Sequence, residues 1–174
     1  MLFPAGCPHS VPVTAVTGTN GKTTTSRLIT HILQHNGNVV GLASTDQVVI
    51  DGVEVVRGDY SGPEGARLVL SDSSVEQAVL EVARGGILRR GLGFSTCDVG
   101  LVFSTTNPSF VPFEMMACRC AVVDLRSERV EGLLEDGVNC RLAEPTPEAI
   151  ADTLLEFIWN KEQRSAIVET AYQQ

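Results

Sequence analysis

Short runs of apolar residues, many of them β-branched, alternate along the chain with longer segments in which apolar residues recur every three or four positions. The short runs have the length of buried strands, and the periodic segments have the spacing of helices that bury one side. We expect strands at 11–17, 38–43, 76–82, 98–103 and 120–125. We expect helices at 22–35, 62–70, 87–90, 113–117, 130–134, 147–159 and 162–172. This alternation predicts an α/β fold, a three-layer αβα sandwich around a mainly parallel P-loop or Rossmann-like sheet.

Two segments give a sharper local prediction. The helix at 22–35 is expected to end at Gly37, and one of its sides should face the sheet. That side carries four apolar residues: Leu28, Ile29, Ile32 and Leu33. Asp51-Gly52, between the apolar stretches 47–50 and 53–56, is a strong signal for a small β-hairpin.

Composition narrows the class of protein. The chain has 174 residues, which is enough for one domain with a substantial core. Its net charge of −8 argues against general binding to nucleic acid or to anionic membranes. The charge is uneven, because residues 1–102 carry a net −2 and residues 103–174 a net −6.

The five cysteines are odd in number and irregular in spacing, so we expect reduced thiols in a cytoplasmic protein. Cys118 and Cys120 are separated by one residue, and no second pair or nearby histidine completes a zinc site. No apolar run reaches the roughly 20 residues of a membrane span, and no signal peptide is evident.

The clearest chemical motif is the segment Thr17-Gly18-Thr19-Asn20-Gly21-Lys22-Thr23-Thr24, which joins an expected strand to an expected helix. Gly18 and Gly21 let the backbone close around an oxyanion, Lys22 supplies positive charge, and the Thr23 hydroxyl is suited to magnesium. The general phosphate-loop motif has a glycine at the position of Val16, so this segment is a variant phosphate loop. It predicts binding of a nucleoside triphosphate, ATP with Mg²⁺; the alternative is a glycine-rich turn with a solvated lysine.

This variant resembles the loop of the Mur ligase superfamily. Further segments resemble the central ATPase module of cyanophycin synthetases over about residues 4–102: Ser44-Thr45-Asp46, Ser61-Gly62-Pro63, 66–70 and 80–89. The resemblance implies an ATP-dependent carboxylate–amine ligase that works through an acyl phosphate. It also implies a nucleotide and a small-molecule or peptide substrate as partners.

The resemblance assigns roles to individual residues. The loop residues Gly18, Thr19, Asn20, Gly21, Lys22, Thr23 and Thr24 would bind the nucleotide. Lys22 and Glu81 would be catalytic, and Thr23 and Glu81 would hold Mg²⁺. Glu81 also ends an apolar run beside a Gly-Gly turn, where ligands bind in α/β sheets, although a helix-cap or surface glutamate has the same pattern. Thr45 and Asp46 either line the same crevice or form a capped turn, and Arg84 and Arg89 face either an acidic group or solvent.

Beyond about residue 102 the chain resembles a different family. Segments at 103–109, 112–118, 121–124 and 135–139 look like the donor-binding part of GT-B glycosyltransferases of the rhamnosyltransferase-like kind. The resemblance implies that Glu114 contacts the ribose of a nucleotide sugar. Glu114 is equally an acidic residue favoured by a helix N-terminus. Arg119 stands where this family usually has glycine.

We therefore interpret residues 1–174 as a single α/β domain built from two family segments, a chimera that crosses over within the strand at 98–103. Three functions remain open: an ATP-binding ligase module that is incomplete for full catalysis, a nucleotide-sugar-binding part of a glycosyltransferase, and a non-catalytic chimera.

Overall fold

The computed structural model describes residues 11–83, 85, 89–95, 97–103, 111–128, 130 and 132–173. The chain divides into two units. One comprises residues 1–16 and 21–95, and the other comprises residues 17–20 and 96–174. The prediction that both segments form one domain remains a prediction.

The first unit is built on strands in the order β4-β3-β2-β5-β1. Their bounds are β1 Val13–Gly18, β2 Val40–Ala43, β3 Gln47–Ile50, β4 Val53–Arg57 and β5 Gln77–Glu81. β5 lies parallel to both β1 and β2, whereas β3 and β4 pair antiparallel. The three parallel strands are almost entirely buried, as expected for strands that are covered on both faces.

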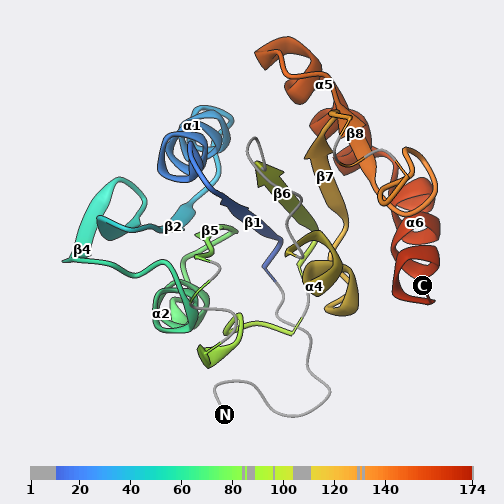
Figure 1. Ribbon diagram of the computed structural model, residues 1–174. Coiled ribbons are helices and arrows are strands. Elements are labelled where there is room, and N and C mark those ends of the chain that lie inside the picture. The colour runs from blue at the N-terminus through green and yellow to red at the C-terminus, as the bar shows by residue number, and fades with distance from the viewer. Residues whose placement is uncertain are drawn as a thin grey trace. The chain divides into compact units, whose positions relative to one another are not determined.

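Two helices provide that cover. α1, Lys22–His35, and α2, Pro63–Ser71, lie on opposite faces of the sheet formed by β1, β5 and β2 (Figure 1). Pro63 occupies the first turn of α2, where the missing N–H costs nothing. The predicted α/β class, with a mainly parallel sheet between helices, is confirmed.

The predicted orientation of α1 is wrong in part. Leu28 and Ile32 are each 57% exposed, and the buried residues of the helix are Ser26 and Thr30. The Thr30 hydroxyl donates to the Ser26 carbonyl at 2.8 Å, so its polar group is satisfied inside the unit. Apolar periodicity therefore misplaced the packed face, because a small polar residue such as Thr30, whose hydroxyl is satisfied within the helix, can pack closely inside the unit.

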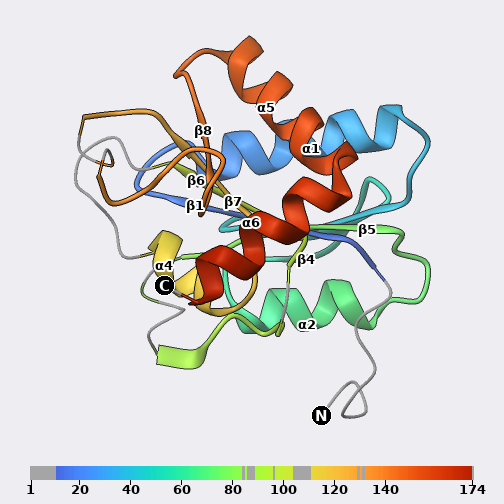
Figure 2. The same ribbon diagram turned by 90° about the vertical axis from the view of Figure 1, so that its right-hand side faces the viewer.

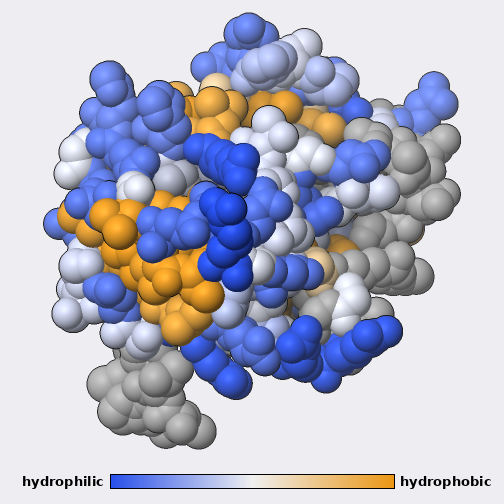
Figure 3. Space-filling view, turned by 90° about the vertical axis from the view of Figure 1, so that its left-hand side faces the viewer, coloured by the Kyte–Doolittle hydropathy of each residue, from blue (hydrophilic) through white to orange (hydrophobic). Residues whose placement is uncertain are grey.

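The predicted hairpin forms as expected. Asp51 and Gly52 both have positive φ, 49° and 78°, which matches the tight turn that twisted hairpins favour. Val53 and Val55 on β4 remain 67% and 54% exposed. Figure 3 shows apolar surface gathered on the face of the molecule where β4 lies.

The second unit contains three parallel strands in the order β6-β7-β8: Val99–Phe103, Val122–Leu125 and Arg141–Ala143. Its helices are α4 Val111–Ala117, α5 Pro147–Trp159 and α6 Lys161–Gln173. α4 packs on β6 and β7, and α5 packs on β7 and β8. α6 runs from α5 back toward α4 (Figure 2).

The helix predicted at 130–134 is wrong, and β8 was not predicted. Residues 130, 132 and 133 lie in turns and Leu134 in a β-bridge, with Val130 and Leu134 buried. Asp136 fixes the following chain, because its Oδ1 accepts hydrogen bonds from the Leu142 N–H at 2.9 Å and from Arg141 Nε at 3.1 Å. A three-residue strand held by one carboxylate leaves no periodic signal in the sequence. Of the helix expected at 87–90, residues 87 and 88 lie outside the described residues, and Arg89 and Arg90 are helical.

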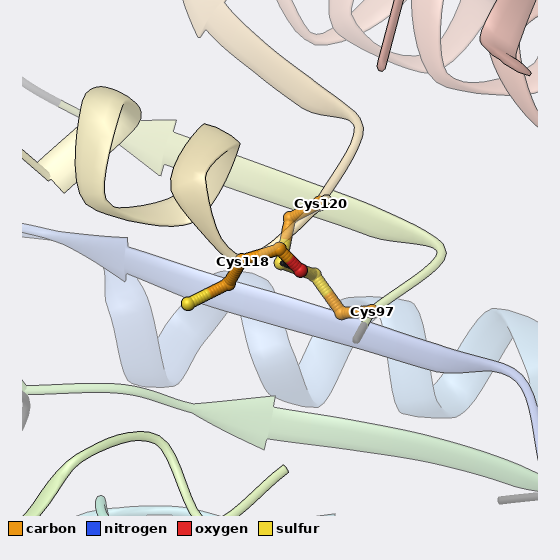
Figure 4. Close-up of a disulfide and its surroundings, with 3 residues drawn as sticks. All are labelled: Cys97, Cys118 and Cys120. Atoms are coloured by element: carbon orange, nitrogen blue, oxygen red, sulfur yellow. Dashed lines mark hydrogen bonds between the residues drawn. A yellow bond between two sulfur atoms is a disulfide. The ribbon is translucent and has the colours of Figure 1, made fainter. Parts of the chain in front are cut away.

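Cys97 and Cys120 form a disulfide, which corrects the expectation of reduced thiols for this pair (Figure 4). Cys97 lies just before β6 and Cys120 just before β7, and their Cα atoms are 4.9 Å apart. These strands are parallel neighbours, so residues 23 apart in sequence meet at one end of the pair. Cys118 is a free thiol whose sulfur points away from the disulfide, and Cys140 is free and buried.

The disulfide leads to a simple chemical prediction. When the protein is denatured without reductant and alkylated, Cys118 and Cys140 should be modified, whereas Cys97 and Cys120 should appear in one cross-linked peptide. Peptide mass spectrometry with and without prior reduction checks this. Alkylation of Cys97 and Cys120 in the unreduced sample would contradict the assignment.

Across the described residues, no helix is both long and apolar enough to cross a membrane.

Candidate functional site

The predicted phosphate loop connects β1 to α1. Gly18 and Gly21 adopt φ values of 141° and 81°, which side chains strongly disfavour. Gly21 is the N-cap of α1 and has no side chain to cap the first N–H groups of the helix. Thr19, Asn20 and Thr24 are exposed, whereas Lys22 and Thr23 are half-buried at the helix start. The segment therefore has the backbone form that a helix N-terminus needs to receive an anion.

Glu81 lies at the carboxyl end of β5, where the parallel register sets it beside Val16 of β1. It is only 1% exposed, so the alternative of a surface glutamate is wrong. Its Oε2 accepts a hydrogen bond from the Thr23 hydroxyl at 3.0 Å and another from the Thr45 N–H at 3.2 Å. Its Oε1 is buried and has no hydrogen-bond partner within the described chain.

Thr45 completes this cluster. Its Oγ1 lies 3.0 Å from the Thr23 Oγ1. Because the Thr23 hydroxyl gives its one proton to Glu81, the Thr45 hydroxyl is the donor to Thr23. The structure thus brings together three residues from three segments, and it leaves one carboxylate oxygen without a partner in a buried place. A buried carboxylate oxygen in that state is energetically costly unless a ligand compensates it.

Asp46, expected in the same crevice, points elsewhere. Its carboxylate Oδ2 pairs with Arg27 Nη2 of α1 at 2.7 Å, and both side chains are about half exposed. Arg84 lies outside the described residues. Among the described residues, no group of three or more histidine, cysteine, aspartate or glutamate side chains is arranged to hold a metal ion.

A cavity of about 200 Å³ opens at the start of α2. Its lining includes Asp59, Ser61, Gly65, Ala83, Arg89 and Arg90. The Ala83 N–H donates to the Ser61 carbonyl at 3.3 Å, so the cavity lies two residues along the chain from Glu81. Arg90 pairs with Glu64 at 3.2 Å. Sequence reasoning singled out Ser61-Gly62-Pro63 only as a point of resemblance and missed this cavity.

Asp59 holds one wall of the cavity. Its Oδ1 accepts hydrogen bonds from the Ser61 hydroxyl at 2.6 Å and from the Ser61 N–H at 3.0 Å. These two hydrogen bonds lower the pKa of Asp59 below its ordinary value. The wall that precedes α2 is therefore fixed by a carboxylate that stays ionised.

In the second unit, Glu114 lies on α4 and its Oε2 is buried without a hydrogen-bond partner in the described chain. Arg119 has a left-handed backbone, φ 56°, at the position where the resembled family has glycine. Its side chain pairs with Glu169 at 2.7 Å and lies 3.9 Å from the centre of the Tyr172 ring. Arg119 therefore ties the end of α4 to α6, which compensates for a backbone conformation that glycine would adopt without strain.

Asp124 at the end of β7 was not singled out by the sequence. It is 1% exposed, its Oδ1 accepts from the Leu125 N–H at 2.7 Å, and its Oδ2 has no partner among the described residues. Burial raises its pKa from 3.8 to about 7.

This shift predicts a pH-dependent stability. Between about pH 4 and 7 the folded protein keeps a proton on Asp124 that the unfolded chain has released, so stability falls as pH rises through that window. The variant Asp124→Asn should flatten this dependence and gain about 1–2 kcal/mol at pH 8, since its unpartnered amide offsets part of the benefit. Urea unfolding at pH 4.5 and 8 measures it. Parallel pH profiles for the two proteins would refute the expectation.

Comparison with known proteins gives two sets of matches. The Mur ligase middle domain family matches residues 16–107. The cyanophycin synthetase of Synechocystis sp. (strain ATCC 27184 / PCC 6803 / Kazusa) is 57% identical over 104 residues, which cover 60% of this chain and 12% of the relative. The O-antigen biosynthesis protein RfbC of Myxococcus xanthus is 41% identical over 80 residues, covering 45% of this chain and 6% of the relative. The chain thus spans only 12% of the length of this cyanophycin synthetase.

Solved structures of both kinds of protein also align with this chain, each over most of its length. A UDP-N-acetylmuramoyl-L-alanyl-D-glutamate–2,6-diaminopimelate ligase aligns with a TM-score of 0.56 at 15% identity, over 82% of this chain and 34% of its own. The C-terminal domain of a group 1 glycosyl transferase, LpcC from Francisella tularensis, aligns with a TM-score of 0.54 at 16% identity, over 99% of this chain and 92% of its own. A bifunctional folylpolyglutamate synthase/dihydrofolate synthase with Mn, AMPPNP and L-glutamate bound aligns with a TM-score of 0.52 at 20% identity, over 86% of this chain and 42% of its own. At these identities the likeness concerns the fold alone. Both resemblances inferred from the motifs are confirmed.

Proposed function

The chain belongs to the Mur ligase middle domain family, matched over residues 16–107, and on that premise we propose that it binds ATP with Mg²⁺ as the nucleotide module of an ATP-dependent carboxylate–amine ligase. The observation that carries the proposal is the buried, unpartnered Oε1 of Glu81 beside the start of α1. The proposal concerns the binding of ATP and Mg²⁺ by the residues of this chain.

The oxygen donors around Glu81 fit a magnesium ion. Mg²⁺ prefers oxygen ligands and is usually held by one or two carboxylates together with substrate phosphates. Glu81 would supply the carboxylate, with the hydroxyls of Thr23 and Thr45 beside it. When bound, the ion neutralises charge that develops on the phosphates during phosphoryl transfer. The folylpolyglutamate synthase with Mn and AMPPNP bound supports a metal–nucleotide pairing on this fold.

The phosphate loop would hold the other side of the nucleotide. The N–H groups at the start of α1, from Gly21 to Thr24, and the positive end of that helix favour phosphate oxygens. Lys22, at the first position of α1, adds a charged donor. These residues bind and orient the triphosphate, and Glu81 sits where the metal and the phosphates would meet.

The cavity at the start of α2 would receive the carboxylate-bearing substrate. Arg89 and Arg90 lie on its wall, and guanidinium groups match carboxylates in geometry as well as in charge. Its closeness to Glu81 through Ala83 and Ser61 supports binding of such a carboxylate near the carboxyl end of β5, the edge of the sheet where the triphosphate would bind.

Calorimetric titration tests the proposal. Mg-ATP should bind, and the dissociation constant for ATP should rise when EDTA replaces Mg²⁺. A UDP-sugar and a dTDP-sugar, titrated in the same series, should give no heat of specific binding. Absence of binding by Mg-ATP overturns the proposal.

One observation favours a second candidate. Glu114 Oε2 is buried and unpartnered in the described chain. The resemblance to glycosyltransferases implies that this position contacts the ribose of a nucleotide sugar. We propose nucleotide-sugar binding by the second unit as the alternative. Binding of a UDP- or dTDP-sugar that is lost in Glu114→Gln supports it, and sugar-nucleotide binding without that loss counts against it.

A further inference from the structure

The turn between β2 and β3 presents two neighbouring residues to α1. Thr45 Oγ1 contacts Thr23 Oγ1 at 3.0 Å, and Asp46 Oδ2 contacts Arg27 Nη2 at 2.7 Å. Thr23 and Arg27 are four residues apart on α1, so they lie on one side of the helix, one turn apart. The turn is therefore fastened to the helix at two points.

The inner point belongs to the Glu81 cluster. The Thr45 N–H donates to Glu81 Oε2 at 3.2 Å, so the position of the turn decides whether this oxygen keeps a second hydrogen bond beside the one from the Thr23 hydroxyl. The turn is also braced within itself, because the Ser44 hydroxyl donates to the Gln47 carbonyl at 3.0 Å. Ser44 fixes the shape of the turn, but it does not attach the turn to α1.

We propose that Asp46 is a positioning residue: its ion pair with Arg27 holds the turn against α1, so that Thr45 engages Glu81 Oε2 and leaves Oε1 available to the metal. This inference rests on the proposed Mg-nucleotide function. Among the described residues, the Asp46 carboxylate pairs with Arg27, whereas Glu81 Oε2 accepts from the Thr23 hydroxyl and the Thr45 N–H. It acts through Thr45.

The ion pair is exposed, with side-chain exposures of 52% for Arg27 and 54% for Asp46. Exposed pairs contribute little to global stability, so the effect should be local. In Asp46→Asn, the melting temperature should stay close to that of the wild type. The amide of Thr45 should exchange with solvent about two- to fivefold faster in the nucleotide-free protein, the range that loss of one exposed pair supports.

The affinity for Mg²⁺ should also decrease when the Asp46–Arg27 ion pair is lost. With AMPPNP present, the affinity for Mg²⁺ should fall about two- to fivefold in Asp46→Asn, while nucleotide affinity in EDTA stays unchanged. The exchanged pair Arg27→Asp/Asp46→Arg should restore both the Thr45 exchange rate and the Mg²⁺ affinity. Glu54→Gln provides a matched control, because it breaks another exposed pair of the same unit, Glu54–Arg57 at 3.0 Å, outside the Glu81 cluster.

The outcomes separate the two proposals. If the wild type binds no Mg-nucleotide, the proposed function is overturned, and the Thr45 exchange rate still decides whether Asp46 holds the turn. If the wild type binds and Asp46→Asn matches it in Thr45 exchange, the positioning role is overturned. Faster exchange with unchanged Mg²⁺ affinity overturns the link from the turn to the metal.

Discussion

Replacing Lys22 by alanine is expected to weaken Mg-ATP binding at least about tenfold, because a charge-assisted contact to phosphate contributes about 1.5–3 kcal/mol. Lys22 is half-buried at the first position of α1, where the helix dipole and the side-chain charge act on the same anion. The loss should appear in the dissociation constant for ATP with and without Mg²⁺, since the side chain acts on the phosphates directly. Isothermal titration measures both values.

The chain supplies its own control for this variant. Lys161 is the only other lysine in the sequence, and it lies at the start of α6 in the second unit. Lys161→Ala removes the same charge and should leave ATP affinity at the wild-type value. Circular dichroism should show that both proteins are folded. Equal ATP affinities for the wild type and Lys22→Ala would then contradict the assignment of Lys22 to the binding site.

Replacing Glu81 by glutamine should have a comparable or larger effect that depends on the metal. Changes around metal ligands typically cost 10–100-fold in metal affinity, and Glu81 is proposed as a direct ligand. The glutamine oxygen can still accept hydrogen bonds from Thr23 and from the Thr45 N–H, so the fold should persist. We therefore expect the affinity for Mg-ATP to fall at least about tenfold.

The metal-free measurement gives the sharper contrast. In EDTA, Glu81→Gln should bind ATP at least as well as the wild type, because a negative charge near the phosphates has been removed. Glu54→Gln, a change at an exposed glutamate on β4, serves as the control for general charge effects. A loss of ATP affinity that is equal with Mg²⁺ and with EDTA would show that Glu81 acts on the fold rather than on a metal.

Several local features could be read directly from the sequence. The bounds of α1 and α5 match the expected helices, because Gly21 and Pro147 mark their starts by local backbone preference. The hairpin at Asp51-Gly52 follows from the positive φ that this dipeptide tolerates. The family resemblances could also be recognised from the sequence, because they rest on motifs of contiguous residues.

The errors share a different cause. The apolar residues Leu28 and Ile32 predicted the wrong packed side of α1, because the helix buries Ser26 and Thr30 instead. The Cys97–Cys120 disulfide depends on the pairing of β6 with β7, which spacing along the chain does not reveal. Asp46 was grouped with Thr45 because they are neighbours, but consecutive side chains of the turn reach different partners on α1.

The sequence by itself determined the alternating strands and helices, the phosphate loop and the family of residues 16–107, because local backbone preference and short motifs act over neighbouring residues. Only the tertiary structure decided that Thr23, Thr45 and Glu81 meet, and that one oxygen of Glu81 is buried without a partner. Parallel pairing of β5 with β1 and β2 brings the ends of distant segments to one edge of the sheet. Register and burial are properties of that pairing, and they turn a loop with a recognisable motif into a candidate metal–nucleotide site.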